Sequence, residues 1–349
     1  MGISNSFAAF LVCLSMSLSG CGSVAHDNPP AGRNSLADSA TDMSGSTAQD
    51  SIGDGPGSCA ERAEFVRRSL QSTAGALAFG PRADRPDIPY GPLARQRLDV
   101  FMSKSRPGNS PAPVIVMVHG GGWCVGDKAL GVVTRNKVEH WTPKGFIFVS
   151  VDYPMIPDGH NALLQATDIA RAVAYVQAHA SEWGGDPHRV ILMGHSAGAH
   201  LVSLVNADAR LRSTFGVGRI LGTVSLDSGA TNVPTQLRKA PPKLKSRYQE
   251  AFGTTENEWT SASPFHQMDR SSAPWLGVCS TRRPDDSCGQ AREYSAKAQT
   301  LGAKASVLPV DLAHGSVNRE LGRNGSYTSS VDQFLGSLDP LVLSLLSRP

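Results

Sequence analysis

HGGGW at residues 119–123 and GHSAG at residues 194–198 decide the fold of this 349-residue chain. The second stretch follows a short apolar run, 190–193, and precedes an apolar segment with helical spacing, 197–207. This order predicts a strand, a tight turn that carries Ser196, and a helix. The flanking glycines suit such a turn, because without a Cβ atom they let the backbone pass close to the serine.

The three glycines of HGGGW follow another apolar run, 114–118. Glycine is unfavourable in regular strand and helix, so the segment predicts a turn at the end of a strand. Such a turn can direct the N–H groups of Gly121 and Gly122, together with that of Ala197, toward a developing oxyanion. The alternative is a flexible surface turn, which the serine motif downstream disfavours.

A nucleophilic serine needs a histidine as general base. Of the ten histidines, His266 and His314 lie usefully beyond the predicted helix. His314 comes just after the apolar stretch 305–310, where a final strand can end and a loop can return the imidazole to Ser196. We therefore favour His314, and we expect His266 to be a loop residue.

Two other histidines, His195 and His200, lie close to Ser196 in the sequence. Adjacent side chains on a turn point in different directions, and His200 belongs to the helix behind the turn. We expect both to be structural residues with satisfied hydrogen bonds.

We expect the acid that orients the histidine to follow the predicted strand 275–279. The following loop carries Asp285 and Asp286, and a helix is predicted from 291 to 301. We favour Asp286 as the acid that holds the tautomer of the base, with Asp285 as the alternative. Asp227, at the end of the predicted strand 223–226, is a third candidate, but we expect it to cap a loop.

The remaining pattern predicts one α/β domain over residues 59–349, with a mainly parallel sheet covered by helices on both faces. A helix is predicted at 162–178 from apolar residues that recur every three or four positions. The segment 230–265 differs in composition, because residues 232–248 are rich in Pro, Lys and Arg. We expect it to form either a solvated insertion or a cap that shapes the substrate pocket. The predicted strands are 114–118, 146–151, 190–193, 223–226, 275–279 and 305–310.

These motifs resemble the carboxylesterase-like group of the α/β-hydrolase superfamily, which includes hormone-sensitive-lipase-like, feruloyl and acetylxylan esterase-like proteins and kynurenine formamidases. The resemblance extends from about residue 96 to the C-terminus and includes RLDVF at 97–101. It implies a serine esterase that cleaves small carboxylic esters through an acyl-enzyme. CSTRRPDDSC at 279–288 departs from the group's H-G-x-x-D-x-x-V-P pattern.

Two other functions fit the same motifs. One is an aryl formamidase of the kynurenine formamidase type. The other is a catalytically idle hydrolase fold that serves as a binding lipoprotein. A net charge of +3 with scattered Lys and Arg gives no support to nucleic-acid binding,. No motif indicates a cofactor, a metal site or an oligomeric state.

The first 58 residues predict the location of the protein. An apolar stretch, 7–18, leads into LSGC at 18–21, which resembles a bacterial lipobox,. We expect a signal peptide at 1–20, lipidation of Cys21, and a flexible Ser/Gly/Asp-rich tether at 21–58 that holds the protein at the membrane of the cell envelope. Plain secretion is the alternative.

The four cysteines after the lipobox predict two disulfides, since an oxidising envelope favours pairing of an even number of thiols. Cys279 with Cys288 would close the loop that carries Asp286. Cys59 with Cys124 would tie the end of the tether beside the HGGGW loop.

Overall fold

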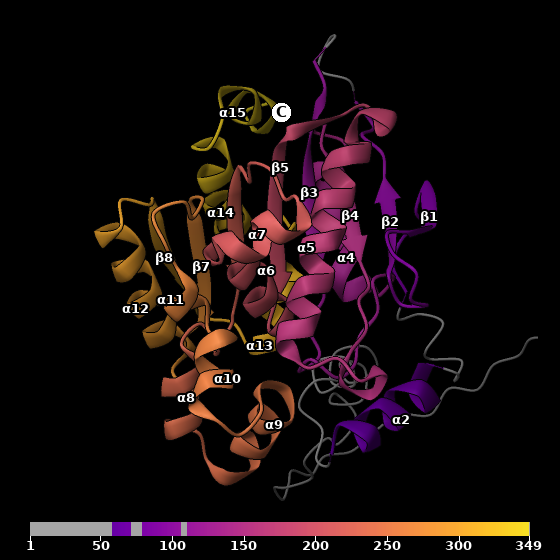
Figure 1. The fold of residues 1–349 in the computed structure, drawn as a ribbon. Helices are drawn as coiled ribbons and strands as arrows, with labels where there is room; N and C mark the ends of the chain where they lie inside the picture. Colours follow the sequence, from indigo (N-terminus) through magenta and orange to yellow (C-terminus); the bar gives the residue numbers. More distant parts are fainter. Residues whose placement is uncertain (1–57, 71–78, 106–109, 349) are drawn as a thin grey trace, which may run out of the picture. The chain divides into compact units, whose positions relative to one another are not determined.

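The computed structural model describes residues 58–70, 79–105 and 110–348, so the signal peptide, Cys21 and nearly all of the tether lie outside the described residues. Within these residues the chain forms an eight-stranded sheet in the order β1-β2-β4-β3-β5-β6-β7-β8 (Figure 1). The strands are β1 (Arg85–Pro89), β2 (Arg97–Phe101), β3 (Ala112–Val118), β4 (Ile147–Val151), β5 (Gly185–His195), β6 (Gly222–Leu226), β7 (Trp275–Ser280) and β8 (Ala305–Val310).

The sheet is mainly parallel, as predicted. All pairings from β4 to β8 are parallel, whereas β2 pairs antiparallel with β4 and β1 antiparallel with β2. All seven residues of β3 are buried, because both faces of the sheet are covered,. Val114 and Val116 pack into one core and Ile115 and Met117 into the other, which follows from the alternation of side chains along a strand,.

Helices cover the two faces of the sheet. α5 and α6 pack with the first core, whereas α4, α13, α14 and α15 supply the second, and α12 packs against β7 and β8. The helices are α2 (Cys59–Leu70), α4 (Gly131–Trp141), α5 (Ala162–His179), α6 (Ala197–Ala207), α7 (Ala209–Phe215), α8 (Val233–Lys239), α9 (Pro242–Phe252), α10 (Glu256–Ser261), α11 (Pro264–Gln267), α12 (Ser287–Thr300), α13 (His314–Glu320), α14 (Ser326–Gly336) and α15 (Pro340–Leu346), with short 3-10 turns η1 (Ile156–Asp158) and η2 (Ala180–Trp183).

The insertion at 230–265 forms α8, α9, α10 and the start of α11. In Figure 1, α8, α9 and α10 lie below the sheet, at the end where α13 also lies. α13 begins four residues after the end of β8, so this is the edge at which the parallel strands finish. Ligand sites of open α/β sheets lie at this edge.

Both predicted disulfides are present. Cys59 pairs with Cys124, which joins α2 to the segment directly after HGGGW. Cys279 pairs with Cys288 and closes the loop between β7 and α12.

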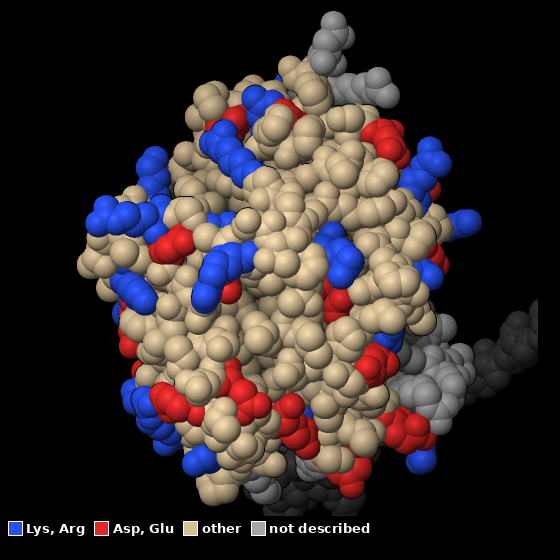
Figure 2. Space-filling model, viewed as in Figure 1, with Lys and Arg blue, Asp and Glu red and all other residues tan. Residues whose placement is uncertain are grey.

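The surface carries charges of both signs. Figure 2 shows Lys and Arg interspersed with Asp and Glu over one face of the molecule, and neutral residues cover most of that face. Among the described residues, no helix is both long and apolar enough to cross a bilayer.

Candidate active site

Ser196 occupies the predicted tight turn between β5 and α6. Its backbone has φ 54° and ψ −116°, a conformation that costs energy for a residue with a side chain,. A Cβ atom on Gly194 would lie 2.4 Å from the carbonyl oxygen of Gly198, and one on Gly198 would lie 2.2 Å from that of Val118. The close approach of three backbone segments therefore requires glycine on both sides of the serine.

His314 reaches this serine from the first residue of α13. Its Nε2 lies 2.9 Å from the Ser196 Oγ, and its Nδ1 lies 2.6 Å from Oδ2 of Asp227. Asp227 directly follows β6, which is the neighbour of β5 in the sheet. The structure thus brings together a serine, a histidine and an aspartate in one hydrogen-bonded chain.

The expectation that Asp286 orients His314 is wrong in this structure. Asp286 is exposed and caps α12, since its Oδ1 accepts the N–H of Gly289 at 2.9 Å. Asp227, which was expected to cap a loop, occupies the position of the acid. The pairing of β5 with β6 places it there, because His195 pairs with Leu226 and the next residues, Ser196 and Asp227, therefore leave the sheet side by side.

The carboxylate of Asp227 is fully buried, and it contacts hydrogen-bond donors from other parts of the chain besides His314. Oδ1 accepts the N–H of Ser280 at 2.8 Å, and Nη1 of Arg283 lies 3.3 Å from Oδ2. Burial raises the pKa of Asp227, but the hydrogen bond from His314 and the charge of Arg283 outweigh burial, so the pKa lies well below its ordinary value,. Asp227 is therefore ionised at neutral pH.

The HGGGW loop lies across from the serine. A Cβ atom on Gly120 would come within 3.0 Å of the Ser196 Cβ, so this loop and the turn are in close contact. Gly121 and Gly122 have φ of 118° and 61°, values that favour glycine, and both line the cavity above Ser196,. Ala197 is the first residue of α6, where backbone N–H groups have no acceptor within the helix,.

Buried polar contacts fix the start of this loop. The Tyr153 hydroxyl donates to the carbonyl oxygen of His119 at 2.9 Å, and the two rings stack with centroids 4.5 Å apart. Nε2 of His119 lies 3.2 Å from Oδ1 of Asp152. These contacts hold His119, the residue directly before the three glycines, in place.

The other histidines have partners elsewhere, as expected. Nε2 of His195 lies 3.0 Å from the carbonyl oxygen of His314, and burial, with repulsion from an imidazolium at His314 as a smaller cause, lowers the pKa of His195 well below its usual range. Nε2 of His200 lies 2.7 Å from the carbonyl oxygen of Ala262, and burial lowers the pKa of His200 to about 4. His266 lies in the short helix α11 and not in a loop as expected, and its Nδ1 contacts the hydroxyl of Ser263, the residue before this helix, at 2.9 Å.

A cavity of about 310 Å³ opens above Ser196 and His314. Leu130, Val132 and Val133 give it an apolar side, and Leu244, Arg247 and Tyr248 of α9 form part of its wall. Residues of the insertion thus line the cavity, and its role as a cap stays a prediction. In the described part of the chain, no group of three or more His, Cys, Asp or Glu side chains is placed to hold a metal ion.

A mainly parallel sheet with helices on both faces, a serine on a turn after β5 and a histidine after β8 define an α/β-hydrolase of the carboxylesterase-like group. Residues 98–281 match the BD-FAE family model, and the chain belongs to the BD-FAE family.

Curated relatives include several esterases. Isoprenylcysteine alpha-carbonyl methylesterase ICME of Arabidopsis thaliana is 28% identical over 249 residues, which cover 66% of this chain and 56% of the relative. Esterase LipC of Mycobacterium tuberculosis is 25% identical over 280 residues, or 76% and 68% of the two chains. A second Arabidopsis protein, the probable methylesterase ICMEL1, is 36% identical, but the match spans 25% of its length. The chain thus spans between a quarter and about two thirds of these relatives.

Solved structures share the fold. Thermogutta terrifontis esterase 2 has a TM-score of 0.62 at 20% identity, over 77% of this chain and 99% of that structure. Esterase B from Lactobacillus rhamnosus has a TM-score of 0.60 at 18% identity, over 80% and 95% of the two chains.

Proposed function

We propose that this protein is a serine esterase that hydrolyses small carboxylic esters through an acyl-enzyme. The observation that carries the proposal is the hydrogen-bonded chain from Ser196 through His314 to Asp227. Relatives named as esterases and the BD-FAE family match support an ester as the substrate.

In the proposed reaction, the Ser196 oxygen attacks the ester carbonyl while His314 Nε2 accepts the hydroxyl proton. The carbonyl oxygen becomes an oxyanion, which the N–H groups of Gly121, Gly122 and Ala197 bind. The C–O bond to the alcohol then breaks, and His314 gives the proton to the departing oxygen. Water, deprotonated by the same histidine, releases the acid and restores the serine.

The test is hydrolysis of p-nitrophenyl acetate by the wild type and by Ser196→Ala. We expect the variant to lose about 10⁴-fold or more in kcat, because the nucleophile is gone. Ser228→Ala is the matched control, since Ser228 lines the same cavity and its hydroxyl accepts the N–H of Ala230 at 3.2 Å. Equal rates for the wild type and Ser196→Ala would refute the proposal.

The same preparations separate the two alternatives. A formamidase would prefer N-formylkynurenine to short esters, whereas an idle binding protein would not be labelled by a fluorophosphonate probe. Labelling of the wild type and of Ser228→Ala, but not of Ser196→Ala, is the expected result.

We also propose export to the bacterial cell envelope with lipidation at Cys21. Two disulfides in the hydrolase domain support an oxidising compartment,. Expression of the full chain with a clickable fatty acid is the test: the wild type should be labelled in the membrane fraction and Cys21→Ala should not. Equal labelling of both would contradict lipidation at this cysteine.

A further inference from the structure

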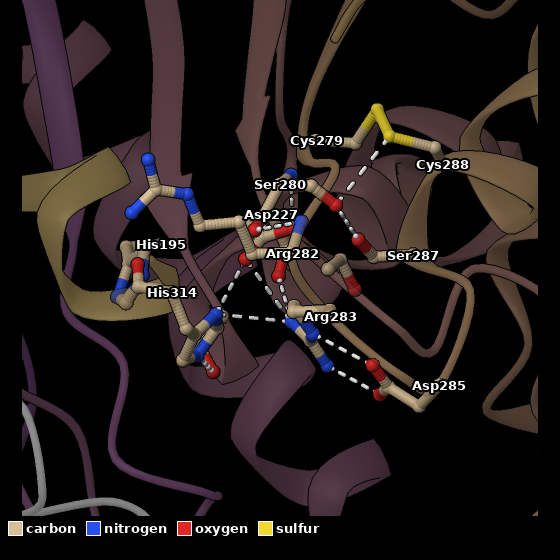
Figure 3. A network of polar contacts seen from close by, with 12 residues as sticks. His195, Asp227, Cys279, Ser280, Arg282, Arg283, Asp285, Ser287, Cys288 and His314 are labelled. Atoms are coloured by element: carbon tan, nitrogen blue, oxygen red, sulfur yellow. Dashed lines mark hydrogen bonds and ion pairs between the residues drawn. A yellow bond between two sulfur atoms is a disulfide. The ribbon is translucent and has the colours of Figure 1, made fainter. Parts of the chain in front are cut away.

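A buried cation lies against the hydrogen bond between Asp227 and His314, in the loop where the sequence predicted the acid (Figure 3). Nη1 of Arg283 donates to the backbone carbonyl of Asp227 at 2.7 Å. The same nitrogen lies 3.3 Å from Oδ2 of Asp227 and 3.0 Å from Nδ1 of His314. The guanidinium therefore contacts both Asp227 and His314, the acid and the base of the triad.

Arg283 is held in this place by an ion pair. Nε donates to Oδ1 of Asp285 at 2.8 Å and Nη2 donates to Oδ2, a two-point contact that fixes the plane of the guanidinium,. Both side chains are largely buried, at 16% and 10% exposure. A Cβ atom on Gly229 would lie 2.8 Å from each of them, so a glycine makes room for the pair.

The loop itself is closed at both ends. The Cys279–Cys288 disulfide joins its two flanks, and the N–H of Ser280 bonds to Asp227. The neighbouring Arg282 differs, because it pairs with Asp311 at the surface, where the two side chains are 57% and 79% exposed. The chain thus offers two adjacent arginines, one beside the triad and one in solvent.

The charge of Arg283 acts on two groups at once. It favours the ionised form of Asp227. Nη1 also lies 3.0 Å from Nδ1 of His314, so an imidazolium at this position would face a like charge,. Four charged or titratable groups lie around this histidine: Asp227 after β6, Arg283 and Asp285 in the loop, and His195 at the end of β5. Two more lie further out. The charge of Lys137 in α4 lowers the pKa of His195, and the charge of Asp227 raises the pKa of Tyr327 in α14.

We propose that Arg283 is a positioning residue of this triad, which holds Asp227 against His314 and opposes protonation of the resting histidine, so that hydrolysis extends to lower pH. The proposal rests on the esterase function proposed above. A histidine that is protonated before substrate binds cannot accept the serine proton, so the group that opposes this protonation sets the acid limit of activity.

The test is the pH profile of kcat/KM for p-nitrophenyl acetate in charge-removing and charge-keeping variants. Arg283→Met and Arg283→Gln should move the acid limb to higher pH by about one unit, because the like charge is lost. Arg283→Lys should keep the limb near that of the wild type, even with a lower plateau. Arg282→Met, the matched surface control, should leave the profile unchanged.

A uniformly slower Arg283→Met or Arg283→Gln with the wild-type limb would overturn the proposal, as would a Lys variant that shifts like the Gln variant. If Arg283→Met does not fold, the Gln and Lys variants answer the same question. Only the shape of the profile is read here. An inactive Ser196→Ala with an unmoved limb in the Arg283 variants would therefore reject this inference and leave the esterase proposal intact.

Discussion

At the residue scale, the orientation of His314 depends on one buried carboxylate. Asp227 is fully buried, and its Oδ2 lies 2.6 Å from Nδ1 of the imidazole. With the proton on Nδ1, the lone pair of Nε2 faces the Ser196 hydroxyl at 2.9 Å,. The acid therefore selects the tautomer that can accept the serine proton.

We predict that Asp227→Asn lowers kcat by about 10³- to 10⁴-fold, because the amide can donate to Nδ1 and so favours the wrong tautomer. The measurement is steady-state hydrolysis of p-nitrophenyl acetate. Asp286→Asn is the matched control, since asparagine caps helices as well as aspartate does and tolerates the left-handed conformation found there, φ 54°,. A slow Asp286→Asn beside a fast Asp227→Asn would restore Asp286 as the acid.

At the element scale, the predictable parts are those where one strong local pattern decides the structure. All six predicted strands are present, because each is an apolar run bounded by turn residues,. α6 has the predicted bounds, 197–207, and α5 ends one residue later than predicted. β1, RPDIP, could not be recognised in this way, because it is an exposed polar strand at the edge of the sheet,.

The acid and its arginine could not be predicted, because their places depend on contacts between elements. Asp227 and Asp286 both follow buried strands that end at the same edge, and only the pairing of β5 with β6 places Asp227 beside the serine. Asp286 is instead the N-cap of α12, which starts at Ser287 rather than at the predicted residue 291. A buried arginine such as Arg283 carries no periodic signal, since its burial comes from an ion pair,.

At the scale of the whole molecule, one buried lysine joins distant parts of the chain. Lys137 of α4 is almost fully buried, and its Nζ donates to the carbonyl oxygens of Val132 at 3.1 Å and Asn318 at 2.6 Å. Asn318 belongs to α13, the helix that begins with His314. Burial lowers the pKa of Lys137 to about 7, so this lysine loses its positive charge near neutral pH,.

We predict that this lysine makes the folded protein more stable as pH rises above 7. Its pKa is about 7 in the folded protein and about 10.4 in the unfolded chain, so between these values the unfolded chain binds the proton more strongly,. Each pH unit in this window adds about 1 kcal/mol to the free energy of unfolding, and Lys137→Met should abolish the gain because methionine does not titrate. Urea unfolding at about pH 7.5 and 8.5 measures the slope. Lys304→Met, which removes an exposed lysine, should keep the wild-type slope. Equal slopes in the wild type and Lys137→Met would show that Lys137 does not carry the effect.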